Sequence, residues 1–233
     1  MTAEDRAIRR VIIAGLLLAI TLLLTFTRVG LIPMPTPAAN ATIAHIPAII
    51  AGILEGPVAG LLVGLGFGFS SFMAATIPMF RDPLVAVLPR LFIGLTAAWT
   101  YRALRRANRP TLIVMLGLLL VFMLAFSYEA YRNMPWLGIV LAVLALAATA
   151  GLYLWMQRED TRIIGIGVAA AVGSLTNTVL VLTVATLRGY IPAEAAWGIG
   201  LTHGIPEVIV AGVVTIAVVA ALRQVGARRR PRL

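Results

Sequence analysis

Residues 41–77 read ATIAHIPAIIAGILEGPVAGLLVGLGFGFSSFMAATI, and this stretch decides how the chain is arranged. It contains two apolar runs, at about 41–54 and 57–77, on either side of Glu55-Gly56-Pro57. A glycine followed by a proline is a turn signal, because glycine tolerates unusual backbone angles and proline cannot continue a helix. The sequence therefore predicts two separate helices. The alternative is one kinked helix from 41 to 77.

The composition predicts an integral protein of the cell membrane. Hydrophobic residues make up 61% of the 233 residues and charged residues only 12%, with a mean hydropathy of +0.98. Soluble domains carry roughly 25% charged residues. The chain has no cysteine, which excludes disulfides and cysteine metal sites. Eight apolar runs are present, at about 11–27, 41–54, 57–77, 84–101, 111–127, 136–156, 163–187 and 198–222.

The distribution of arginine supports the turn and sets the expected orientation. With the turn, most arginines fall on one side of the membrane, which is the cytoplasmic side by the positive-inside rule. They are Arg6, Arg9, Arg10, Arg102, Arg105, Arg106, Arg109, Arg158, Arg162, Arg228, Arg229, Arg230 and Arg232. The prediction is an all-α membrane bundle of eight spans with both termini in the cytoplasm. The basic ends are expected to contact anionic lipid rather than nucleic acid.

Two segments near the N-terminus have specific expectations. The first run is expected to be a retained span, because no small-residue cleavage site follows it. The next segment, LIPMPTPAAN at 31–40, is too rich in proline to continue a helix. The run after it spans only about 21 Å of a hydrocarbon core of about 30 Å. We therefore predict a lid over a site on the outer side, with an ordinary extracellular linker as the alternative.

Small residues at intervals of four predict close helix packing. One row consists of Gly60, Gly64 and Gly68, and a second consists of Gly165, Ala169 and Gly173. The second row continues to Asn177, which places this side chain against a neighbouring helix rather than lipid.

Four polar side chains, His45, Arg90, Asn177 and Glu207, lie within apolar runs. A charge at membrane depth costs about 2.5–3.5 kcal/mol even on an insertion scale, so such groups usually face a bundle interior or a ligand path. Counting residues from the nearest loops places Arg90 and Glu207 about 12 Å, and Asn177 about 16 Å, below the outer boundary. We expect one site for an anionic ligand, with His45 joining from above. Alternatively, Arg90 and Glu207 form a buried ion pair.

Catalytic and metal motifs are missing from the sequence. It has no phosphate-binding loop, nucleophile elbow or HExxH pair. The two histidines, His45 and His203, have no third metal ligand nearby, so we expect neither a metal nor a cofactor. An enzyme using Glu207 and His203 as acid and base would lack a nucleophile. The loop carboxylates Asp82, Glu194 and Glu55 are expected to be solvated.

Several motifs resemble a known family when taken in order. They are ATIAHIPAII at 41–50 with Glu55-Gly56-Pro57, DPLV at 82–85 with Leu88-Pro89-Arg90, GSLTNTVL at 173–180 and HGIPE at 203–207. This set resembles the substrate-binding S component of energy-coupling factor (ECF) transporters over about residues 8–105 and 163–225. The pattern is most similar to the pantothenate-type branch.

The resemblance implies a six-helix vitamin-capture subunit, not an enzyme, that works with a transmembrane coupling protein and two ATPase subunits. It implies substrate binding by His45, Arg90, Asn177, Glu207, Thr42, Asn40, Thr176 and His203. The family uses an Ala-xxx-Ala pair on its first helix to meet the coupling protein, and Gly15 and Ala19 hold those positions here. Internal packing or plain lipid exposure of this pair is the alternative.

The chain departs from the six-helix pattern between the fourth and fifth family helices. Residues 110–157 form two additional apolar runs, an inserted hairpin that leaves every other orientation unchanged. The expected parts are therefore 1–109, 110–157 and 158–233. A different function, a stand-alone secondary transporter in which Glu207 carries protons, stays open at this point.

Overall fold

The computed structural model describes residues 3–33, 40–133, 135–158 and 160–228. The chain divides into two compact units. The first comprises Met1–Arg102 and Gly165–Leu233, and the second comprises Ala103–Ile164.

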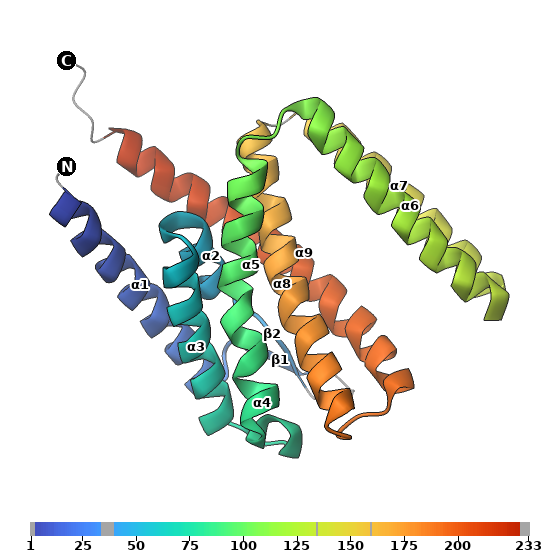
Figure 1. The fold of residues 1–233 in the computed structure, drawn as a ribbon, viewed down its shortest axis with the longest axis horizontal. Helices are drawn as coiled ribbons and strands as arrows, with labels where there is room; N and C mark the ends of the chain where they lie inside the picture. Colours follow the sequence, from blue (N-terminus) through green and yellow to red (C-terminus); the bar gives the residue numbers. More distant parts are fainter. Residues whose placement is uncertain (1–2, 34–39, 134, 159, 229–233) are drawn as a thin grey trace. The chain divides into compact units, whose positions relative to one another are not determined.

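Within the described residues the first unit is helical except for one short ribbon (Figure 1). In chain order, its elements are α1 (Ala3–Phe26), β1 (Leu31–Pro33), β2 (Asn40–Thr42), α2 (Ile46–Glu55), α3 (Pro57–Met73), the 3-10 helix η1 (Pro78–Arg81), α4 (Pro83–Ala86), most of α5 (Leu88–Leu104), most of α8 (Thr161–Leu187) and α9 (Ala193–Arg228). The second unit is built from α6 (Arg109–Asn133) and α7 (Pro135–Arg158).

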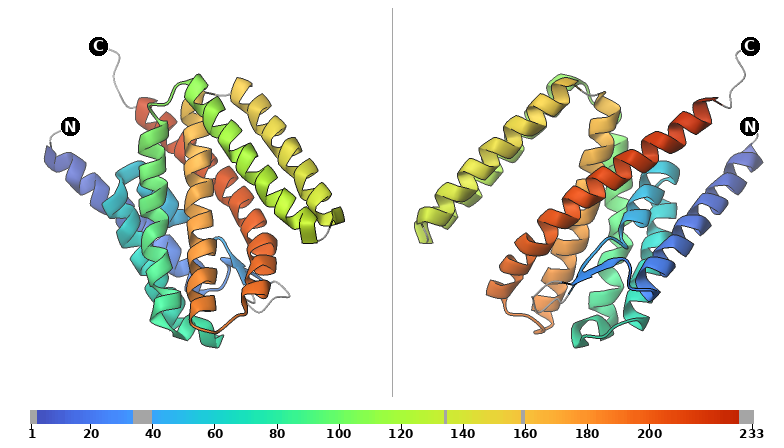
Figure 2. Two further views of the ribbon diagram at one scale, coloured as in Figure 1. Left: turned by 45° about the vertical axis from the view of Figure 1, so that its right-hand side comes forward. Right: turned by 180° about the vertical axis from the view of Figure 1, so that it is seen from behind.

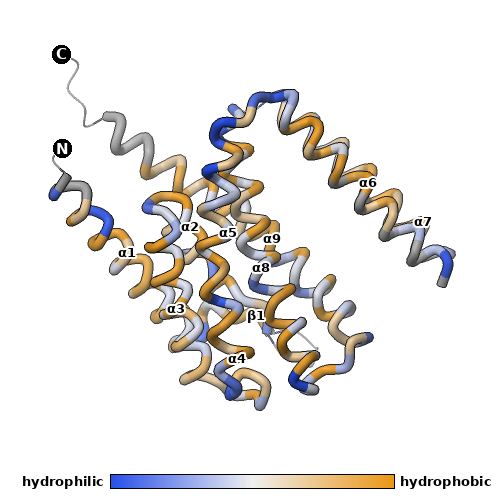
Figure 3. The backbone as a smooth tube through the Cα atoms, viewed as in Figure 1, coloured by the Kyte–Doolittle hydropathy of each residue, from blue (hydrophilic) through white to orange (hydrophobic). Residues whose placement is uncertain are grey.

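The lengths and apolarity of the helices confirm a multi-pass membrane protein. Five described segments are long and apolar enough to cross a membrane: Ala7–Phe26, Pro83–Leu104, Gly138–Arg158, Thr161–Leu187 and Ala193–Leu222. Three shorter apolar helical segments are Ile46–Glu55, Pro57–Met73 and Arg109–Ala125. Figure 3 shows hydrophobic colour along most of each helix, and a hydrophilic stretch where α5 ends and α6 begins.

The turn predicted at Glu55-Gly56-Pro57 is confirmed, and the single kinked helix is wrong. Helix α2 ends at Glu55 and α3 begins at Pro57. Gly56 between them has φ 102°, a conformation that side-chain-bearing residues rarely adopt. Its N–H donates to the carbonyls of Ala51 and Gly52, which closes the end of α2. Pro57 stands at the first helical position, where its missing N–H costs nothing.

The first predicted glycine row packs against α5, which confirms the close approach of helices. A Cβ at Gly64 would collide with the carbonyl of Arg90, and one at Gly68 with the backbone of Val87. Gly60 meets Gly94 of α5 backbone to backbone, and Gly52 of α2 meets the same glycine. Helices α2, α3 and α5 are thus held at distances that no larger residue would allow.

The proline-rich segment forms part of an antiparallel ribbon, which the all-α prediction did not include. Strands β1 and β2 pair with Leu31 opposite Thr42 and Pro33 opposite Asn40. The ribbon lies inside the first unit, and β2 contacts α9 (Figure 2). Residues 34–39, the centre of the predicted lid, lie outside the described residues. The ribbon arises because the prolines exclude a helix while the strands still satisfy their backbone groups.

In the second unit, α6 and α7 lie side by side as a hairpin (Figure 2). Arg109 at the start of α6 donates to the side chain and carbonyl of Gln157 near the end of α7, at 3.5 and 3.4 Å. At the opposite end, Gly138 packs on the backbone of Tyr131. The two helices are therefore antiparallel over their whole length.

Candidate ligand-binding site

The four polar side chains found in apolar runs are all buried. Their exposed fractions are 0% for His45, 3% for Arg90, 5% for Asn177 and 6% for Glu207. His45 precedes α2, and the others lie on α5, α8 and α9 respectively. The first unit thus encloses these groups instead of presenting them to lipid.

Glu207 ties three elements together through its carboxylate. Its Oε1 accepts a hydrogen bond from the backbone N–H of Thr42 at 2.7 Å, and its Oε2 accepts one from the Thr178 hydroxyl at 3.1 Å. The Thr42 hydroxyl in turn donates to the Gly30 carbonyl at 3.2 Å. The carboxylate therefore fixes β2 against α8 and α9, at the base of the predicted lid.

Arg90 is held by a carbonyl and two aromatic rings. One guanidinium nitrogen donates to the carbonyl of Val85. The guanidinium carbon lies 4.9 Å from the centre of the Phe80 ring and 5.5 Å from that of Phe67, distances typical of cation–π contacts. Although both residues are described, Arg90 forms no ion pair with Glu207. The two side chains form no direct contact, but their opposite charges still attract each other, so mutual neutralisation stays the alternative interpretation.

Two cavities meet at Arg90. The larger has a volume of about 290 Å³ and the smaller about 50 Å³. Both are lined by Asn40, Thr42, Phe80 and Arg90, so these four residues form the partition between them. The smaller cavity is also lined by Asn177, His203 and Glu207.

Two buried polar atoms in this region have no hydrogen-bond partner within the described residues, Nε of Arg90 and Oδ1 of Asn177. Buried polar atoms are nearly always paired with protein or water, because an unmade bond costs about 1–3 kcal/mol. One is a donor and the other an acceptor, and both side chains line the small cavity. The side chains beside the small cavity thus hold one unused donor and one unused acceptor.

Two predicted site residues, His45 and Thr176, line neither cavity. His45 Nε2 and the Ser174 hydroxyl are 3.1 Å apart, and His45 lines neither cavity. Thr176 pairs its hydroxyl with that of Thr96 at 2.9 Å and donates to the Val172 carbonyl at 2.7 Å. It also lines neither cavity, and its bonds join α8 to α5. These contacts support the helices that carry the site.

Some residues of the site were missed by reasoning from the sequence. Phe67 and Phe80 hold Arg90, and Thr178 binds Glu207. Thr178 carried a detectable signal, because Ser174 and Thr178 are four apart and therefore share one polar face of a helix. Phe80 carried none, since it lies in the four-residue 3-10 helix η1, which is too short to give a recognisable pattern.

Asp82 was expected to be solvated, but it is only 7% exposed and joins two loops. Its Oδ1 caps α4 by accepting from the Leu84 N–H at 2.9 Å. Its Oδ2 accepts from Arg188 Nε at 2.7 Å and from the Tyr190 hydroxyl at 3.4 Å. The hydrogen bond from Arg188 is the main cause that lowers the pKa of Asp82 below 3.8. This contact fixes the loop carrying Phe80 to the α8–α9 connection.

Metal ligands do not gather in the described part of the chain, where no three His, Cys, Asp or Glu side chains are grouped to hold an ion. The fold and the site instead define a membrane protein with a small cavity lined by both polar and apolar side chains. Comparison with known families gives the class: residues 9–219 match the ECF transporter, substrate-specific component, and the chain belongs to this family. It is also 26% identical over 227 residues to the pantothenic acid transporter PanT of Lactococcus lactis subsp. cremoris (strain MG1363), a match that covers 94% of each chain.

Proposed function

We propose that the chain captures a small water-soluble vitamin with high affinity at the outer face of the membrane, and that the vitamin is pantothenate. The observation that carries this proposal is the pair of buried, unpartnered atoms, Arg90 Nε and Asn177 Oδ1, in side chains that line the smaller cavity. The similarity to a pantothenic acid transporter supports the choice of ligand.

The chemistry of pantothenate suits the groups on the cavity walls. The ligand carries a carboxylate at one end and hydroxyl and amide groups along its length. The Arg90 guanidinium would bind the carboxylate by a charge-assisted hydrogen bond, which is stronger than a neutral one. Asn177, Asn40 and His203 would bind the hydroxyl and amide groups, while Glu207 holds Thr42 and the ribbon in place.

The partners proposed for this subunit are a transmembrane coupling protein and two ATPase subunits, which would supply the energy. We place eight spans in the chain, with both termini in the cytoplasm, and assign 1–109 and 158–233 to a six-helix core. Residues 110–157 would be an accessory hairpin. The compact unit Ala103–Ile164, formed by α6 and α7, supports this assignment.

Gly15 and Ala19 of α1 are the proposed contact with the coupling protein. Both are exposed. A Cβ at Gly15 would meet no atom within 4 Å, so the internal-packing alternative has no support from this position. A smooth exposed stripe on a membrane helix allows another helix to approach closely.

Binding and transport are tested separately. Calorimetry on the purified subunit should show saturable, one-to-one binding of pantothenate, and native mass spectrometry should show whether the purified protein retains a vitamin. Lack of binding to any water-soluble vitamin would contradict capture. In liposomes, pantothenate uptake should require the coupling protein, both ATPases and ATP. Uptake by the subunit alone, driven by a proton gradient, would instead support the secondary transporter.

Membrane orientation can be tested because the natural chain has no cysteine. Single cysteines at the exposed positions Glu194 and Gln157 should differ in their labelling by an impermeant thiol reagent. Glu194→Cys should react from outside the cell, and Gln157→Cys only after permeabilisation. The reverse result would overturn the proposed orientation.

A further inference from the structure

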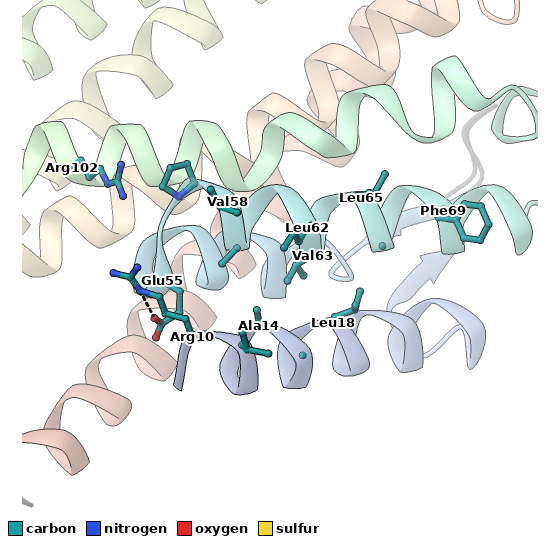
Figure 4. A pocket seen from close by; sticks show the side chains of 15 residues that line it. Arg10, Ala14, Leu18, Glu55, Val58, Leu62, Val63, Leu65, Phe69 and Arg102 are labelled. Carbon is teal, nitrogen blue, oxygen red and sulfur yellow. Dashed lines mark ion pairs between the residues drawn. The ribbon is translucent and has the colours of Figure 1, made fainter. Parts of the chain in front are cut away.

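A groove of about 940 Å³ runs between α1 and α3, and it is larger than either cavity at Arg90 (Figure 4). Its walls are formed mostly by aliphatic side chains and Phe69. In Figure 4 the labelled residues Arg10, Glu55 and Arg102 lie towards one end, and Phe69 lies towards the other. The groove is therefore apolar along its length and charged at one end.

The apolar part has the dimensions of a lipid chain. Val58 is 71% exposed, and Leu62 and Phe69 are exposed along the same helix. From Val58 to Phe69 the helix rises about 17 Å, and one leaflet contributes about half of a hydrocarbon core of about 30 Å. A single acyl chain lying along α3 would thus cover these side chains within one leaflet.

The charged end carries more positive than negative charge. Arg9 and Arg10 lie 3.9 and 3.8 Å from the carboxylate of Glu55, whose side chain is only 6% exposed. Glu55 is therefore not solvated, contrary to expectation, and it holds Arg10 at the end of the groove. The exposed Arg102 lines the same end from α5. Arg10 and Arg102 line this end beside the single carboxylate of Glu55, and the long distances of its pairs with Arg9 and Arg10 leave N–H donors available.

We infer that this groove binds one anionic phospholipid, with an acyl chain between α1 and α3 and its phosphate against Arg10 and Arg102. The charge complementarity selects a lipid with net negative charge over a zwitterionic one. The apolar walls select a lipid over free phosphate, because only a lipid covers both parts of the groove. This inference does not rest on the ligand or the partners proposed above, although Gly15 of the proposed coupling contact also lines the groove.

The test titrates the full chain in detergent with one lipid at a time and counts bound molecules by native mass spectrometry. Phosphatidylglycerol should bind as one molecule that resists removal by detergent. Phosphatidylcholine with identical acyl chains should bind much more weakly, and inorganic phosphate should not bind. Each arginine near an anionic lipid surface strengthens binding by about fivefold. Removing both charges in Arg10→Gln/Arg102→Gln should therefore weaken phosphatidylglycerol binding by about thirtyfold.

The matched control is Arg105→Gln/Arg106→Gln, which removes the same charge from exposed arginines outside the groove. This control should leave the tight phosphatidylglycerol unchanged, and thermal unfolding should show that both double variants are folded. Equal loss in the two variants would mean general attraction of anionic lipid and would overturn the site. Equal retention of the two lipids, or binding of detergent only, would overturn it as well.

A second variant probes the apolar part alone. Val58→Trp adds bulk at an exposed position on the groove wall and keeps the charge constant. It should reduce retained phosphatidylglycerol while pantothenate affinity and unfolding temperature stay the same. Full lipid retention by this variant would place the lipid elsewhere and contradict the groove.

Discussion

Replacing Arg90 by glutamine tests whether its charge binds the ligand. Among the described residues, Arg90 is the one arginine that lines both cavities, and Arg28 lines the larger cavity alone. A hydrogen bond to a charged group contributes about 1.5–3 kcal/mol, so pantothenate affinity should fall by about ten- to a hundredfold. Calorimetry on the purified subunit measures this change directly.

The same substitution also affects stability, and the assay must separate the two effects. Arg90 loses its bond to the Val85 carbonyl and its contacts with Phe67 and Phe80, each cation–π contact contributing about 0.5–2 kcal/mol. A lower unfolding temperature is therefore expected. Affinity is compared only at a temperature at which both proteins are fully folded.

A neutral ligand makes the Arg90 prediction specific. The alcohol analogue of pantothenate lacks the carboxylate, so its affinity should be almost the same for the wild type and Arg90→Gln. Thr176→Val, which changes a hydroxyl that lines neither cavity, should leave both affinities within about twofold. Unchanged pantothenate affinity in folded Arg90→Gln, or equal losses for both ligands, would refute the role of the charge.

Three further predictions concern other parts of the first unit. Glu207→Gln replaces the carboxyl oxygen that accepts from the Thr42 N–H by part of an amide, which cannot also keep the bond from the Thr178 hydroxyl with its NH₂ group. The free energy of unfolding should therefore fall by about 1–3 kcal/mol in thermal or denaturant unfolding, and no change would contradict the role of these bonds. Because the pKa of Asp82 is lowered by Arg188, its contribution to stability is present above about pH 3.8 and is lost as the pH falls through the folded value. Asp82→Asn should therefore lower the unfolding temperature near neutral pH and make the unfolding temperature fall less steeply as the pH is lowered. If the variant loses stability in acid as steeply as the wild type, the contact between Asp82 and Arg188 does not cause that loss. Gly15→Leu should block ATP-driven uptake while leaving pantothenate affinity intact, and normal uptake would remove this face of α1 from the coupling step.

The sequence was sufficient to predict the helices and the small-residue contacts. Apolar runs and the Gly56-Pro57 signal depend on local properties of the chain, and the structure has both α2 and α3 where they were expected. The depth count also placed Arg90, Asn177 and Glu207 at one level, and these three side chains line one cavity. Depth is predictable because a helix rises uniformly along its axis.

The partners of the buried charges could not be predicted in the same way. Which groups meet depends on the rotation of each helix and on the path of the loops, and the sequence specifies neither. Glu207 therefore binds a strand amide at Thr42 rather than Arg90, and Arg90 binds a carbonyl and the ring of Phe80. The ribbon escaped prediction because three-residue strands give too short a pattern to be recognised.

The meeting of Gly52, Gly60 and Gly94 has a mechanical consequence. Where backbone touches backbone, no side chain is present that could rotate and absorb a relative displacement. Helices α2, α3 and α5 should therefore move as one rigid block, and pairs of spin labels on them should keep constant distances when ligand is added. The ribbon and η1 would then be the parts that move. Glu207 holds the ribbon and Asp82 holds the end of η1 by individual hydrogen bonds, which can break one at a time.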